Sequence, residues 1–128
     1  STPVVVDFLA RHPAVERVWW AEQPTTRAAY ARVKRPGGGA GAVVSFTLRG
    51  ELARFYDRVA LPKGPSFGMA TTLLSPYTYL AHYDLLPRPG GADGAELRRA
   101  GLSPDLLRLS VGTEPAEEII AALAAALA

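Results

Sequence analysis

The segment from Leu106 to Glu114 constrains the fold most, because its pattern is that of a short strand running through a glycine into the last helix. Side chains alternate along a strand, so Leu107 and Leu109 share one face and Arg108 lies on the other. Arg108 therefore points away from the helix-covered core. An arginine on a rigid strand presents its guanidinium to a carboxylate or phosphate with fixed geometry. The segment predicts an anion-binding strand, and a substrate carboxylate is its natural ligand.

Proline, glycine and threonine positions divide the chain into alternating helices and strands. In the second helix, Tyr30 and Val33 are expected to point inward. Residues 76–94 are the least regular part of the sequence. Four strands and about five helices follow. The expected elements are a helix over 4–12, a strand over 15–20, a helix after Pro24 that ends by 36–39, a strand over 42–48, a helix after Gly50, a strand over 66–75, a helix over 95–100, the strand at Arg108 and a helix that begins at Pro115.

Strands joined by helices predict an α+β fold, with a mainly antiparallel four-stranded sheet and helices packed on one face. The chain has 128 residues, which suits one ordinary domain but is short for an enzyme that holds a large cofactor. No internal repeat is visible. We therefore expect a single domain over residues 1–128.

Four segments occur along the chain in a fixed order: Leu9–Val15, Gly41–Phe46, Ser66–Gly68 and Leu107–Glu114. Together they resemble the C-terminal domain of the Cys/Met-metabolism family of pyridoxal-phosphate (PLP) enzymes, which includes cystathionine synthases and lyases and methionine gamma-lyases. The resemblance implies the small C-terminal domain of a fold-type I enzyme. It also implies that the large PLP-binding domain is absent from this chain.

The resemblance assigns roles to four residues. Arg108 would hold the α-carboxylate of the substrate, and Ser66 would line the active site near that carboxylate. Pro65 and Met69 would shape the pocket, because both depart from the family pattern, in which glycine is usual at the position of Met69. Two ordinary interpretations stay open: Arg108 as a surface arginine of an amphipathic strand, and Ser66 as a turn hydroxyl.

The lysine content bears on the cofactor. Covalent PLP catalysis requires an active-site lysine. Lys34 and Lys63 are the only lysines, and neither lies in the Ser-x-Thr-Lys setting of the family. We expect PLP in the complete enzyme but none bound covalently by this chain, and no catalytic residue within it. The partner is the missing PLP-binding domain, in the same polypeptide or a split one, and Trp19 and Trp20 are candidates for contacting it.

Two functions remain in competition. The resemblance implies a domain of a PLP-dependent carbon–sulfur lyase or transferase that acts on a sulfur amino acid or a cysteine adduct, is inactive alone and forms a homo-oligomer when complete. The alternative is a non-catalytic α+β module that binds a small molecule or another protein.

Several other classes are disfavoured by composition. The chain has no cysteine, which excludes disulfides and thiolate zinc sites. His12 and His82 lack metal-ligand partners at suitable spacing, so no metal site is expected. The basic clusters at 32–35 and 98–99 are typical of solvated helix faces and not of a nucleic-acid motif. No apolar run approaches a membrane span and no secretory signal is visible, so we expect a cytoplasmic protein.

Overall fold

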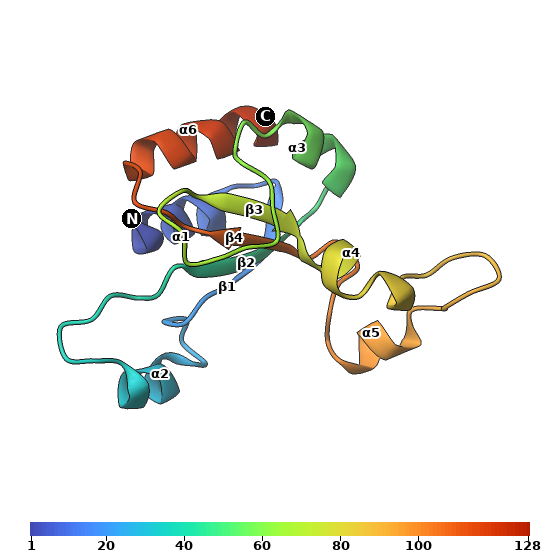
Figure 1. Ribbon diagram of the computed structural model, residues 1–128, viewed down its shortest axis with the longest axis horizontal. Coiled ribbons are helices and arrows are strands. Elements are labelled where there is room, and N and C mark those ends of the chain that lie inside the picture. Colours follow the sequence, from blue (N-terminus) through green and yellow to red (C-terminus); the bar gives the residue numbers. More distant parts are fainter.

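The computed structural model describes all of residues 1–128, as a four-stranded sheet surrounded by helices (Figure 1). The strands are β1 (Val15–Trp19), β2 (Val43–Leu48), β3 (Leu73–Pro76) and β4 (Leu107–Ser110). The helices are α1 (Thr2–Arg11), α2 (Arg27–Val33), α3 (Leu52–Arg58), α4 (Tyr77–Ala81), the 3-10 helix η1 (Tyr83–Leu85), α5 (Ala95–Arg99) and α6 (Ala116–Leu127). None of these helices combines the length and apolar character that crossing a membrane requires.

The sheet has the strand order β1-β2-β4-β3, and every neighbouring pair is antiparallel. The last strand of the chain, β4, therefore lies in the interior of the sheet, with β2 on one side and β3 on the other. Figure 1 shows α1, α3 and α6 gathered on one side of this sheet. The predicted α+β class, with an antiparallel four-stranded sheet and helices on one face, is confirmed.

The core lies between the sheet and these helices. Alternation along the strands sends Val44 and Phe46 of β2 and Leu107 and Leu109 of β4 into this layer, where all four are fully buried. The Phe46 ring meets Phe55 of α3 edge to face, with 6.0 Å between ring centroids. The predicted inward face of β4 is thus confirmed, and Arg108 lies on the opposite face.

The helix α2 corrects one expectation. Tyr30 and Val33 were expected to face a core, but α2 has no buried residue and Val33 is 81% exposed. The helix projects from the sheet on an arm (Figure 1). The arm is held by its own contacts: the Tyr30 hydroxyl donates to the carbonyl of Gly39 at 2.9 Å, and Lys34 pairs with Glu22 at 2.6 Å.

A second projection carries α4, η1 and α5 beyond the end of β3, away from the α2 arm (Figure 1). Residues 76–94 were predicted to be the least regular part of the chain, and they contain only the short helices α4 and η1. Outside the main core, this region contains the buried residues Leu86, Leu97 and Leu106. The hydroxyl of buried Thr78 donates to the Ser103 carbonyl at 2.7 Å, which ties α4 to the segment before β4.

The strand predicted over 66–75 is wrong in its first part, because β3 begins only at Leu73. Residues 65–72 instead form an irregular connection that we call the strap. Gly68 has a φ of +70°, which breaks an extended course and which residues with a Cβ rarely adopt. The backbone N–H of Thr72 donates to the carboxylate of Glu114 at 2.6 Å, so it is not available for pairing with a neighbouring strand.

Candidate functional site

Arg108 stands in the middle of the sheet face that α1 and α6 leave uncovered. It pairs with Ser45 of β2 on one side and with Ser75 of β3 on the other, so the three residues form a row across the sheet. Trp19 pairs with Ser45 and extends the row onto β1. Arg108 is half-buried. The Arg108 side chain is therefore attached to a rigid part of the molecule, as the sequence predicted.

The guanidinium makes three contacts. Its Nη2 donates to the backbone carbonyl of Pro65. Its central carbon lies 5.1 Å from the ring centroid of Phe67 and 5.4 Å from that of Tyr77. No acidic side chain pairs with it: the three ion pairs of the protein involve other residues. Arg108 thus carries a positive charge with no internal counter-charge, which suits it to an external anion.

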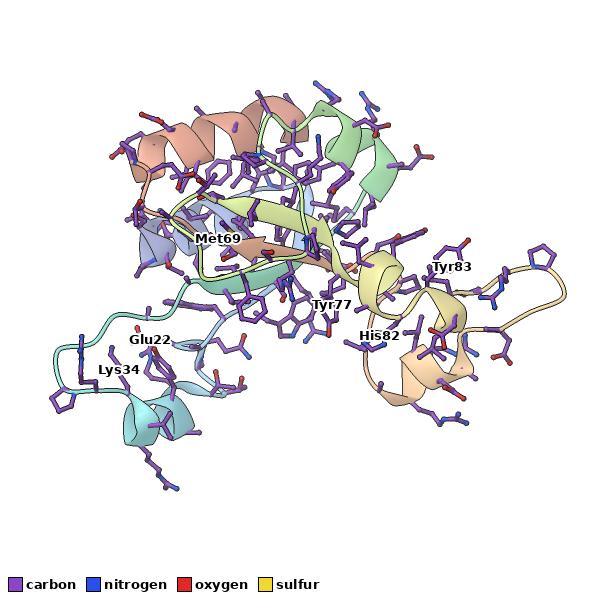
Figure 2. All side chains as sticks on the ribbon, viewed as in Figure 1. Glu22, Lys34, Met69, Tyr77, His82 and Tyr83 are labelled. Atoms are coloured by element: carbon purple, nitrogen blue, oxygen red, sulfur yellow. The ribbon has the colours of Figure 1, made fainter.

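The structure brings Pro65 and Ser66 to Arg108, whereas Figure 2 shows Met69 apart from Tyr77, a neighbour of Arg108. Pro65, Ser66 and Met69 belong to the strap, far from Arg108 in sequence, and the strap crosses the sheet so that Pro65 contacts Arg108 directly. Ser66 lies between Pro65 and Phe67, which both touch the guanidinium. The side chains of the strap from Pro65 to Met69 are exposed.

The strap is fastened to the end of β4 and to the turn after it at three places. Gly68 N–H donates to the hydroxyl of buried Ser110 at 3.0 Å, and Thr113 N–H donates to the Ala70 carbonyl at 2.7 Å. The strongest attachment centres on Thr72, which is fully buried. Its hydroxyl donates to Glu114 at 2.8 Å and accepts from the N–H of Gly112 at 2.8 Å. These bonds fix the strap relative to the strand that carries Arg108.

The hydrogen bonds from Thr72 change the pKa of the Glu114 carboxylate. The backbone N–H of Thr72, with a smaller contribution from the Thr72 hydroxyl, lowers the pKa of Glu114 below its ordinary value. The unfolded chain therefore binds a proton at a higher pH than the folded chain does. The stabilisation by ionised Glu114 is full above the unfolded pKa of about 4.3 and is lost as the pH falls through the folded pKa.

This linkage predicts how stability depends on pH. We expect the urea concentration at the unfolding midpoint to decrease when the pH is lowered from 6 to 3.5. The decrease should be smaller in the Glu114→Gln variant, because glutamine does not titrate. Measuring urea unfolding of both proteins at the two pH values checks this. Exposed Glu117, also near the start of the last helix, supplies the matched control, and Glu117→Gln should behave like the parent. An equal fall in the Glu114→Gln variant would contradict the assignment.

The two lysines lie apart from Arg108. Lys34 is on the α2 arm in its pair with Glu22, and Figure 2 shows this pair well separated from Tyr77 and His82. The amine of Lys63 donates to the Val59 carbonyl at 3.2 Å and lies over the ring of Tyr56. Neither lysine shares a contact with Arg108.

Comparison with known proteins identifies the family. The sequence model described as "Cys/Met metabolism PLP-dependent enzyme" matches residues 1–128, the whole chain. The chain belongs to this family. The predicted resemblance is confirmed, and with it the connection to PLP-dependent lyases and synthases of sulfur amino-acid metabolism.

Relatives within the Cys/Met-metabolism family include two curated proteins. The chain is 46% identical over 112 residues to L-2-amino-4-chloropent-4-enoate dechlorinase/desaturase of Streptantibioticus cattleyicolor, covering 88% of this chain and 22% of that protein. It is 40% identical over 122 residues to a cystathionine gamma-synthase of Neurospora crassa, covering 94% and 18%. The chain therefore spans about a fifth of the length of these relatives.

A solved structure supports the fold assignment. A cystathionine gamma-lyase from Micromonospora echinospora matches with a TM-score of 0.77 and 29% identity, over 98% of this chain and 32% of that one. The expected likeness to the small C-terminal domain of fold-type I PLP enzymes is confirmed.

Sequence reasoning missed two parts of the site. Tyr77 was placed in the least regular segment, and only the pairing of β3 with β4 reveals that it follows the strand next to Arg108. The bonds between Thr72 and Glu114 were also missed. One signal was available: Glu114 follows Gly112 closely, and a glycine at that point permits another backbone segment to approach.

Proposed function

We propose that this chain is the substrate-carboxylate-binding domain of a PLP-dependent carbon–sulfur lyase or transferase, inactive without the remainder of that enzyme. The substrate is a sulfur amino acid or a cysteine adduct. The observation that carries the proposal is Arg108, a half-buried cation that lies at the centre of the open sheet face without an acidic partner. Membership of the family supports the assignment of a carboxylate to this cation.

The residues of this chain would bind and orient the substrate. The guanidinium of Arg108 donates one Nη2 hydrogen to Pro65, so four of its five N–H groups are left to bind the carboxylate oxygens. Ser66, exposed beside this contact, would donate its hydroxyl to the same carboxylate. Pro65 and Met69 would border the substrate side chain and set the room available to it. This role is positioning, which brings the reacting carbon to a fixed place.

The cofactor would be held by a part of the enzyme outside these residues. When bound, PLP accepts electron density from the bond that breaks. Two findings support an external site: neither lysine shares a contact with Arg108, and the chain spans about a fifth of its curated relatives. The names of these relatives, a gamma-synthase and an enzyme acting on a 4-chloro amino acid, favour a leaving group on the γ carbon.

A surface for the rest of the enzyme lies between β1, the start of β2 and the α2 arm. An open groove there is lined mainly by apolar side chains, among them Trp19, Trp20, Val33 and Val43. Val33 and Val43 are exposed in the isolated chain. Apolar surface of this kind usually marks an association site. We assign it to the PLP-binding part of the enzyme, in agreement with the role expected for the two tryptophans.

The intact native gene product tests the proposal. We expect its mass to exceed the 13.6 kDa of this chain and its spectrum to show the visible absorbance of bound PLP. If a second polypeptide supplies the cofactor, the colour should appear when that partner is added. A colourless native protein of 128 residues, which stays colourless with candidate partners, would instead favour the non-catalytic binding module.

A further inference from the structure

Two aromatic rings from different parts of the fold lie next to the Arg108 guanidinium. Phe67 belongs to the strap, and Tyr77 is the first residue of α4. Behind Tyr77 stands His82, whose ring lies 5.6 Å from the Tyr77 ring in an edge-on arrangement. Figure 2 shows Tyr77 and His82 close together where β3 passes into α4. Phe67 and Tyr77 therefore both adjoin Arg108, and His82 adjoins Tyr77.

These rings constrain the guanidinium differently from a hydrogen bond. A guanidinium attracts aromatic faces through its charge and its planar shape, while its N–H groups point outward along its edges. The Pro65 carbonyl occupies the donor Nη2. Together, the rings and this bond set the position of Arg108 and leave four of its five N–H donors for a ligand. A free arginine side chain would have to give up rotamer freedom on binding, which weakens affinity.

The exposure of Phe67 argues against a purely structural role for its ring. Phe67 is 64% exposed, so its ring contributes little to the core, and it is absent from the main hydrophobic cluster. Tyr77 is half-buried, it is also absent from that cluster, and its ring lies near the guanidinium. Removing the Phe67 ring should therefore change Arg108 more than it changes the fold.

We propose that Phe67 and Tyr77 are positioning residues that hold the Arg108 guanidinium in its binding orientation before the substrate carboxylate arrives, with His82 supporting Tyr77. The inference rests on the proposed function, in which Arg108 binds that carboxylate. The two rings then contribute to the selectivity of the site for a carboxylate over a neutral group of similar shape.

The test compares two probes with the complete, cofactor-loaded protein. L-norvaline has a carboxylate and no leaving group, and L-norvalinamide has a neutral amide in its place. Calorimetric titration gives the dissociation constant of each, and their ratio measures carboxylate selectivity without any turnover. We expect Phe67→Leu and Tyr77→Leu each to reduce this ratio by about threefold to fivefold, since a cation–ring contact at a solvent-accessible site has this strength.

Two variants serve as controls. Tyr77→Phe keeps the ring and should keep the parent ratio within about twofold, because the ring face makes the contact. Tyr79→Leu removes an exposed tyrosine of the same helix that does not contact Arg108, and it should also keep the ratio. Thermal unfolding of each variant separates a local effect from loss of the fold.

The outcomes distinguish the two proposals through Arg108→Ala. If this variant loses selectivity while both leucine variants retain it, the positioning role is wrong and the carboxylate-binding function stands. If Arg108→Ala keeps the parent ratio, the proposed function itself is wrong, and the positioning role with it. A loss of selectivity in Tyr79→Leu as large as in Tyr77→Leu would also overturn the positioning role.

Discussion

Replacing Arg108 by alanine in the complete, cofactor-loaded protein is expected to lower kcat/KM for the amino-acid substrate by about 100-fold. Removing one member of a hydrogen-bonded charge pair in a partly desolvated site costs about 3 kcal/mol, which corresponds to this factor. The loss should appear mainly in KM, with a decrease in kcat if the carboxylate contact also aligns the reacting carbon. Steady-state kinetics over a range of substrate concentrations measures both quantities.

The chain offers a control for this prediction. Arg11 lies at the end of α1, on the helix-covered side of the sheet, and its exposed guanidinium pairs with Asp7 at 2.8 Å. Arg11→Ala should leave kcat/KM within about twofold of the parent, because surface substitutions away from a site have small effects. Arg108→Lys should recover only part of the activity, since an ammonium lacks the planar fork. Equal losses in Arg11→Ala and Arg108→Ala would refute a specific role for Arg108.

The strand β4 shows how much of this site the sequence determines. Alternation alone places Leu107 and Leu109 in the core and Arg108 on the other face, because one slip in register would bury the charge. The final helix is predicted in the same way, from the helical spacing of apolar residues such as Ile119 and Leu123, and both of these side chains are buried. A local pattern of this kind determines which side chains face the core, so the face that carries Arg108 was predicted correctly.

The strap and the α2 arm show where such patterns fail. Thr71, Thr72, Leu73 and Leu74 favour extended backbone, yet Thr72 makes its bonds with Glu114, which is 42 residues away in sequence. Likewise, the helical spacing of Tyr30 and Val33 does not say whether a core lies beside them. Both errors have one cause: the deciding partner is distant in the chain or lies outside it. The site depends on such distant contacts more than the core does.

Substituting Gly112 by alanine is expected to lower the free energy of unfolding by about 3 kcal/mol, because overpacking against rigid groups in a tight space has effects of this size. A Cβ at Gly112 would collide with the Ala70 carbonyl oxygen and the Thr72 backbone nitrogen, as well as with the Glu114 carboxylate. Two of the three are backbone atoms and cannot rotate aside. Relief requires the strap to move away from β4, which breaks the bonds around Thr72.

Urea unfolding of Gly112→Ala against Gly50→Ala measures this effect. A Cβ at Gly50 meets no atom within 4 Å and its φ is not positive, so Gly50→Ala should leave stability unchanged within about 0.5 kcal/mol. Because the strap also carries Pro65 and Phe67 to Arg108, Gly112→Ala should weaken carboxylate selectivity under conditions where the protein is still folded. A stable Gly112→Ala protein would mean that the strap yields readily, and the fixed geometry attributed to Arg108 would then need another source. Destabilisation together with lost selectivity would show that one turn after β4 supports both the fold and the orientation of the arginine.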